Sequence, residues 1–182
     1  MVNENEHSLT AIQWFNKGYD YDSKEDYENA IFAYSKAIEL NPQDADAYIN
    51  RGVVYDIRGE YDLAIEDYTK AIELNPQDVD TYTNRGAAYA GKGEYDLAIQ
   101  DYTKAIALNP EDADSHAHRG NAYTAKGNYN LAIDDYNKAI ELQPEDADFY
   151  IDRVIACEKS GQYNSTQLEA MKQKIRELSG HS

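Results

Sequence analysis

The chain has 182 residues and a formal net charge of −17, because 34 aspartate and glutamate residues outnumber 17 lysine and arginine residues. Such an acidic surface repels phosphate backbones and anionic lipid, and no apolar stretch approaches the ~20 residues of a membrane-spanning helix. We therefore expect neither nucleic acid nor a membrane as a partner, and the single cysteine, Cys157, excludes an internal disulfide.

Residues 1–10 carry no basic cluster and no apolar run, so the sequence predicts neither a signal peptide nor a transit peptide there. We interpret these residues as an N-terminal extension. A lone cysteine is typical of a reducing compartment. The expected location is therefore cytoplasmic.

From residue 11 the chain repeats with a period of 34 residues, which four prolines mark: Pro42, Pro76, Pro110 and Pro144. A period of this length predicts an array of small units, each of which buries its apolar face against its neighbours. The predicted regular repeats are 11–44, 45–78, 79–112 and 113–146. Glycine, tyrosine and alanine columns keep the same spacing: Gly18, Gly52, Gly86 and Gly120; Tyr21, Tyr55, Tyr89 and Tyr123; Ala30, Ala64, Ala98 and Ala132; Ala37, Ala71, Ala105 and Ala139.

Each regular repeat predicts two helices, which in the second repeat run over about residues 46–57 and 61–74. A glycine that can take a left-handed conformation follows the first helix, at Gly59, Gly93, Gly127 and Gly161. An aspartate follows each proline and is placed to cap the next helix, at Asp44, Asp78, Asp112 and Asp146. The proline itself ends the preceding helix.

The fifth unit, residues 147–179, departs from the pattern and is followed by a short tail, 180–182. Val154 occupies the glycine column and Cys157 the tyrosine column, where we expect a buried and inert thiol. We interpret this unit as a degenerate C-terminal cap. The first unit is regular, which would leave the N-terminal end of the array less protected.

The columns together resemble the tetratricopeptide repeat family, whose pattern runs Trp or Tyr, Gly, Tyr, Ala, aromatic, Ala and Pro. The first repeat meets this pattern throughout, with Trp14, Gly18, Tyr21, Ala30, Tyr34, Ala37 and Pro42. The fourth repeat departs only at His116, which we expect to fill a tyrosine position. The resemblance implies an all-α fold, a right-handed α-solenoid of antiparallel helix pairs with about ten helices.

An arginine column and an acid column change together along the repeats. The arginines stand 16 residues before an acid in four units, whereas the first unit has Lys17 followed by Ala33. The pairs are Arg51 with Asp67, Arg85 with Asp101, Arg119 with Asp135, and Arg153 with Glu169. We predict an ion pair within each of these units, and the alternatives are solvated charges that happen to align or arginines that bind a ligand.

The resemblance also implies that the first helices of the repeats line a concave groove for a peptide or a partner helix. Asn16, Asn50 and Asn84 could form a ladder of amides that bonds the backbone of an extended ligand, or they could be ordinary polar surface. The predicted groove residues are Phe15, Asn16, Tyr19, Ile49, Asn50, Val53, Thr83, Asn84, Ala87, Ala117, His118 and Asn121.

Acidic residues form a predicted rim to this groove: Asp46, Asp80, Asp114, Asp148 and Asp152. Those in the first turns of helices interact favourably with the helix dipole. Their negative potential also favours a basic peptide. The cations with which some family members grip acidic C-termini are missing here, so the resemblance does not extend to that clamp.

The sequence predicts no catalytic residues, no metal site and no cofactor. His116 and His118 are two residues apart, so on a helix they point in different directions. The chain has no phosphate-binding glycine loop, nucleophile elbow or zinc motif. We therefore expect a non-catalytic interaction module or adaptor that binds a protein or peptide partner. The alternatives are a homo-oligomer formed by stacking of repeats and an accessory subunit of a larger complex.

Overall fold

The computed structural model describes residues 9–180 of the chain. Residues 1–8 lie outside the described part, and with them most of the predicted N-terminal extension; so do residues 181 and 182 of the predicted tail. The described residues form ten α-helices and no strand, which confirms the predicted all-α fold of helix pairs. No helix between residues 9 and 180 has the length and apolar character that crossing a membrane requires.

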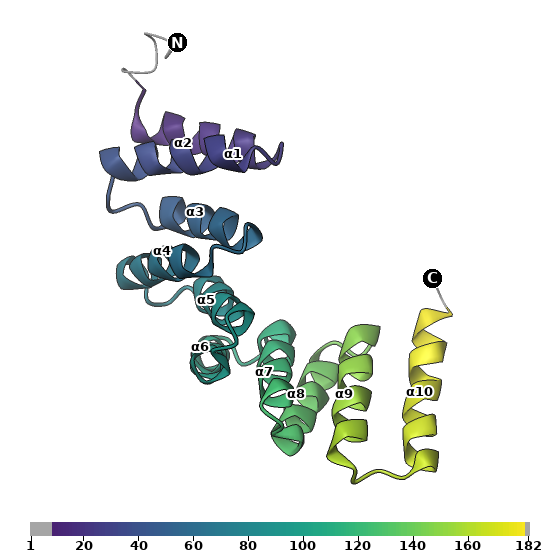
Figure 1. Ribbon diagram of the computed structural model, residues 1–182. Coiled ribbons are helices and arrows are strands. Elements are labelled where there is room, and N and C mark those ends of the chain that lie inside the picture. Colours follow the sequence, from purple (N-terminus) through teal and green to yellow (C-terminus); the bar gives the residue numbers. More distant parts are fainter. Residues whose placement is uncertain (1–8, 181–182) are drawn as a thin grey trace. The chain divides into compact units, whose positions relative to one another are not determined.

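The helices, labelled in Figure 1, belong to two units. The first unit ends at Lys92 and contains α1 (Ala11–Asp22), α2 (Tyr27–Leu40), α3 (Ala45–Ile57), α4 (Tyr61–Leu74) and α5 (Val79–Gly91). The second unit begins at Gly93 and contains α6 (Tyr95–Leu108), α7 (Ala113–Ala125), α8 (Tyr129–Leu142), α9 (Ala147–Ser160) and α10 (Ser165–Ser179). Within each unit, every helix packs against the next one along the chain.

The predicted aspartate caps begin α3, α5, α7 and α9. The Asp44 carboxylate, for example, accepts a hydrogen bond from the Ala47 N–H at 3.3 Å. The helices α2, α4, α6 and α8 each end two residues before a proline, as predicted. Thr10 caps α1 and is itself bonded by Gln13 in a reciprocal capping box, which the sequence analysis missed.

The turns after α3, α7 and α9 use a left-handed glycine, with φ of 75° at Gly59, 79° at Gly127 and 67° at Gly161. The first repeat has a glutamate at the corresponding place. Glu25 adopts φ of 59° and is the one non-glycine residue with positive φ in the described part of the chain. Its Cβ therefore strains a turn that the other repeats make without strain.

Replacing Glu25 by glycine should stabilise the protein by about 0.5–1 kcal/mol, because relief of left-handed strain of about 1–2 kcal/mol exceeds the added flexibility of the unfolded chain. Thermal denaturation of the two proteins would measure the gain. Glu25→Ala is the matched control, since it removes the charge and keeps the Cβ. An equal gain from alanine would show that the charge, and not the backbone, causes the effect.

Close approach of the two helices of a repeat explains the glycine column and the aromatic column that contains Tyr34, Tyr68, Tyr102 and Tyr136. A Cβ at Gly52 would lie 2.8 Å from the Tyr68 ring, and one at Gly120 would lie 2.8 Å from the Tyr136 ring. Both rings are almost fully buried. Each tyrosine therefore fills a space that exists only because its partner position has no side chain.

Polar residues close the N-terminal end of the first unit. Two positions of the first helix are buried in every later repeat. The first position holds Ala47, Thr81, Ser115 and Phe149, and the second holds Val54, Ala88, Ala122 and Ala156. In α1 the same positions hold Gln13 and Asp20, and both are exposed. The less protected N-terminal end stays an expectation, although α1 carries polar side chains at the two positions where a preceding repeat would pack. At the other end, α10 has no buried residue, as expected for a cap.

Candidate functional site

Arg51 lies between the second helices of two neighbouring repeats and bonds to both. Its Nε and Nη2 donate to the two Asp67 carboxylate oxygens at 2.7 Å each. Its Nη1 donates to the Ser35 hydroxyl at 2.8 Å. The rings of Tyr48 and Tyr55 lie 5.9 Å and 5.8 Å from the guanidinium carbon. The predicted ion pair is confirmed here, in the bidentate geometry that arginine favours.

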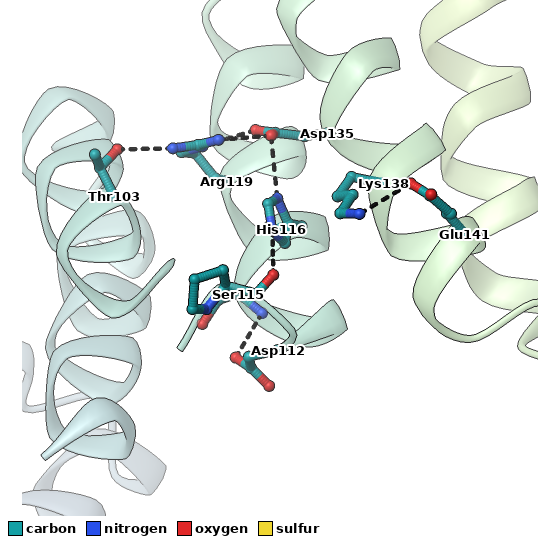
Figure 2. A network of polar contacts seen from close by, with 9 residues as sticks. Thr103, Asp112, Ser115, His116, Arg119, Asp135, Lys138 and Glu141 are labelled. Carbon is teal, nitrogen blue, oxygen red and sulfur yellow. Dashed lines mark hydrogen bonds and ion pairs between the residues drawn. The ribbon is translucent and has the colours of Figure 1, made fainter. Parts of the chain in front are cut away.

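The second unit repeats this arrangement, as Figure 2 shows. Arg119 donates to Asp135 at 2.8 Å and 2.7 Å, and its Nη1 donates to the Thr103 hydroxyl at 3.1 Å. This confirms the second predicted pair. Arg85 and Asp101 belong to different units, so their pairing stays a prediction; within the first unit Arg85 donates to the Thr69 hydroxyl at 3.1 Å.

The predicted pair between Arg153 and Glu169 was wrong. Arg153 donates to the Asn137 side-chain oxygen at 3.0 Å, and Glu169 pairs with Arg176 of its own helix at 2.7 Å. In α10 the acid of this column, Glu169, therefore pairs within its own helix and not with the arginine of the preceding helix. All four arginines bond a hydroxyl or amide side chain 16 residues earlier, at Ser35, Thr69, Thr103 and Asn137. These partners also recur with the 34-residue period, so they are visible in the sequence as a polar column 16 residues before the arginines.

His116 fills a tyrosine position, as predicted. Its Nε2 lies 3.3 Å from the Pro110 carbonyl oxygen, and the hydroxyls of Tyr82 and Tyr150 donate to Pro76 and Pro144 at 3.4 Å and 3.0 Å. Its Nδ1 lies 3.5 Å from Asp135 (Figure 2). The ring is buried. It therefore serves packing and is not directed at a ligand.

Cys157 is a free, fully buried cysteine, as predicted. Burial raises the pKa of its thiol, although a hydrogen bond with Tyr163 and, less strongly, the charge of Arg153 act in the opposite direction. Burial nevertheless dominates, so the thiol stays protonated and unreactive.

The predicted groove residues of the first unit lie on α1, α3 and α5. Tyr19 is 61% exposed, and Phe15, Ile49 and Val53 are half-buried against the core. Ile12, which is not among the predicted groove residues, is 68% exposed and occupies the position of the later rim acids. The apolar surface of α1 is therefore larger than predicted. On α5, Thr83 and Asn84 are half-buried and Ala87 is exposed.

The predicted amide ladder has unequal members. Asn16 is exposed, whereas the Asn50 side-chain amide donates to the Asp46 carbonyl oxygen of its own helix at 2.8 Å. The nitrogen of Asn50 thus already has a partner. The rim acids Asp46 and Asp80 are exposed at the starts of α3 and α5.

The predicted groove residues of the second unit are mostly occupied by contacts of their own. Ala117 is buried and packs in one cluster with Phe149. His118 stacks on Tyr102 with ring centroids 5.6 Å apart. Asn121 accepts a hydrogen bond from the Tyr136 hydroxyl at 2.7 Å. The rim acids Asp114 and Asp148 are exposed, whereas Asp152 is half-buried.

Three half-buried carboxyl groups on the first helices have raised pKa values: Asp22, Asp56 and Asp152. Burial is the main cause in each case, because it disfavours the charged form. At Asp152 a hydrogen bond from Asn121 partly opposes the rise. These acids are therefore less stable as anions than ordinary surface carboxylates.

Moderate acidification should therefore raise the melting temperature. A carboxyl group with a higher pKa in the folded chain opposes folding when it is ionised, and this penalty disappears as the pH falls through the folded pKa. We expect the melting temperature to rise between about pH 7 and about pH 5, where ordinary carboxylates with a pKa of about 4 remain charged. Calorimetry at constant ionic strength would measure it. Asp56→Asn should melt higher at neutral pH and gain less on acidification; a continuous fall for the unsubstituted protein would contradict this account.

Comparison with known families gives two matching models. One described as tetratricopeptide repeat matches residues 45–78, 79–112 and 113–146, and one described as TPR repeat matches residues 18–56. A search of curated proteins gives no match. Among the described residues 9–180, no three or more histidine, cysteine or acidic residues are grouped to hold a metal ion.

Solved structures share the fold over nearly the whole chain. A crystal structure of MamA protein is 26% identical with a TM-score of 0.86, and the match covers 93% of this chain and 92% of that one. MamA 41-end from Desulfovibrio magneticus RS-1 is 19% identical with a TM-score of 0.88, and covers 94% and 96%. YrrB, described as a TPR protein with an unusual peptide-binding site, is 23% identical with a TM-score of 0.78, and covers 96% and 89%.

Proposed function

Since the chain belongs to the tetratricopeptide repeat family, we propose that it is a non-catalytic adaptor that binds an extended peptide segment of a protein partner. The binding surface is that of α1, α3 and α5 in the first unit. One observation carries the proposal: Ile12 and Tyr19 present large exposed side chains beside half-buried Phe15, Ile49 and Val53. Exposed apolar side chains that gather on one surface are typical of an interaction site.

Polar groups on the same helices support an extended ligand. Asn16, Asn84 and the side-chain oxygen of Asn50 can bond a peptide backbone whatever its sequence. Asp46 and Asp80 add exposed negative charge at the starts of α3 and α5. The net charge of −17 makes the electrostatic potential of the chain as a whole negative as well. Basic segments are therefore the favoured ligands, and their affinity falls as salt rises.

The fold is compatible with this use, because YrrB, which shares it, is described as having a peptide-binding site. The proposal includes a cytoplasmic location, which the lone cysteine favours. Homo-oligomerisation by stacking of repeats is the alternative. Exposed Gln13 and Asp20 disfavour stacking through α1, and light scattering after size exclusion would reveal a stacked oligomer directly.

Selection of a phage-displayed random dodecapeptide library on the purified full chain tests the proposal. We expect enriched sequences, whose synthetic peptides bind at least tenfold more weakly to Tyr19→Asp and Val53→Asp variants, as measured by calorimetry. A Leu131→Asp variant is the matched control, because Leu131 is 48% exposed on α8 of the second unit. Equal binding by all variants would place the peptide elsewhere and refute the proposed surface.

A further inference from the structure

In the described part of the first unit, residues 9–92, two buried side-chain polar groups have no hydrogen-bond partner. The Tyr34 side chain is fully buried, and its hydroxyl bonds to no other group. The Oδ1 atom of Asp56 is likewise buried and unpaired. Buried polar groups in folded proteins are nearly always bonded, so each exception needs an explanation, and a ligand group that bonds it is one such explanation.

The fourth repeat shows how the same place is satisfied without a ligand. There the Tyr136 hydroxyl donates to the Asn121 side-chain oxygen at 2.7 Å and lies 3.2 Å from the Thr124 hydroxyl. The position of Asn121 is Tyr19 in the first repeat and Val53 in the second, and that of Thr124 is Asp22 and Asp56. The first two repeats therefore replace an internal hydrogen-bond network by a carboxylate next to an aromatic or apolar side chain.

The carboxylates of Asp22 and Asp56 have no cation of their own in the part of the chain that the structure describes. Burial raises the pKa of each, with no opposing contribution from a lysine or arginine. Both act electrostatically on the buried phenols: Asp22 on Tyr34, and Asp56 on Tyr68. Each of the first two repeats thus combines a half-buried acid with a buried tyrosine on which it acts.

Arg51 shows what such a combination holds in this fold. It sits on a carboxylate, in bidentate contact with Asp67, and between the rings of Tyr48 and Tyr55. The planar guanidinium suits both contacts, whereas a lysine ammonium cannot make the two parallel bonds. The edge of the Phe15 ring against Tyr34, with centroids 5.6 Å apart, adds an aromatic wall to the first of the two places.

We propose that Asp22 with Tyr34, and Asp56 with Tyr68, are two arginine-binding subsites of the peptide surface, one in each of the first two repeats. The inference rests on the proposed function and specifies the ligand: a peptide segment that inserts arginine side chains. The guanidinium neutralises each carboxylate and donates to its oxygens. At the first subsite, the side chains that cover the Tyr34 hydroxyl move aside when the peptide binds, and the hydroxyl gains the guanidinium as a partner.

The test uses the dodecapeptides that the full chain enriches, with arginine replaced one at a time by citrulline, its neutral isostere, or by lysine. We expect enriched sequences to contain arginine. Citrulline should weaken binding at least tenfold, and lysine should weaken it less. Asp56→Asn and Asp22→Asn should each weaken the arginine peptide at least tenfold, whereas Glu66→Gln, an equal change of charge at an exposed position of α4, should leave it unchanged.

Combining substitutions in the chain with substitution of the peptide arginine distinguishes a specific subsite from general attraction of a basic peptide to an acidic chain. In a variant carrying both Asp22→Asn and Asp56→Asn, the arginine and citrulline peptides should bind equally. An undiminished preference for arginine in that variant would overturn the inference. Enriched peptides without arginine would overturn it too, yet leave the proposed function standing; failure to enrich any peptide would refute both. Circular dichroism and melting of each variant would establish that it is folded.

Discussion

Replacing Asp67 by alanine should destabilise the first unit by about 3 kcal/mol, since it leaves a charged guanidinium without its partner. The side chains of Asp67 and Arg51 are 7% and 19% exposed, so water replaces the lost carboxylate only in part. The estimate lies at the lower end of the range for a buried pair because Arg51 keeps Ser35 and some solvent. Urea denaturation followed by circular dichroism would measure the change in the free energy of unfolding.

A double-mutant cycle isolates this pair. Arg51→Ala combined with Asp67→Ala should cost less than the sum of the single substitutions, because no charge is then left unpaired. The salt bridge between Lys92 and Asp62 is the matched comparison, since Asp62 is 81% exposed. Its loss should cost at most about 0.5 kcal/mol. If Asp67→Ala cost no more than Asp62→Ala, the ion pair of Arg51 with Asp67 would have no special role in stability.

Replacing Tyr68 by alanine should cost about 3–5 kcal/mol, the range for a buried aromatic side chain. Its ring is 1% exposed and packs in one cluster with Ala64 and Ala88. The surrounding helices are held by their own contacts, so we expect a cavity over Gly52. The same denaturation experiment would measure the loss, and a cost below that of the exposed-pair control would contradict the packing described here.

The shape of the contact between Tyr68 and Gly52 predicts a reversal of sign. Gly52→Ala alone should destabilise by about 1–2 kcal/mol, because a Cβ 2.8 Å from a fully packed ring forces a shift. In the Tyr68→Ala background the same substitution should be neutral or stabilising by up to about 1 kcal/mol, since the space is open and alanine favours the helix. Additive effects would mean that the two positions do not interact.

The fold was predictable from the sequence because each 34-residue repeat has the same capping, helix-ending and turn residues. Aspartate after proline begins the first helices, the prolines follow the ends of the second helices, and glycine or a strained residue makes the turn between them. The pairs of Arg51 with Asp67 and Arg119 with Asp135 were also predictable, since the two columns change together. His116 could be assigned to a tyrosine position for the same reason.

Other features depend on contacts that the period does not reveal. Glu169 does not pair with the arginine 16 residues earlier, because Arg176 lies within reach on its own helix. Ile12 escaped notice because its column otherwise holds acids. The sequence does not reveal that the Tyr34 hydroxyl and Asp56 Oδ1 are unpaired, because a hydrogen bond depends on distances of a few tenths of an ångström. The predicted binding surface as a whole remains a proposal for experiment.

The arginine column also bears on how such an array can grow. Arg51 takes one partner 16 residues earlier and another 16 residues later, and both offsets recur at Arg119. A duplicated segment of 34 residues therefore carries its own arginine, its own acid and a hydroxyl for the unit that follows it. Insertion or loss of a whole repeat recreates every link at the new junction. The length of the array can thus change in evolution by unequal recombination, without a search for new compensating substitutions.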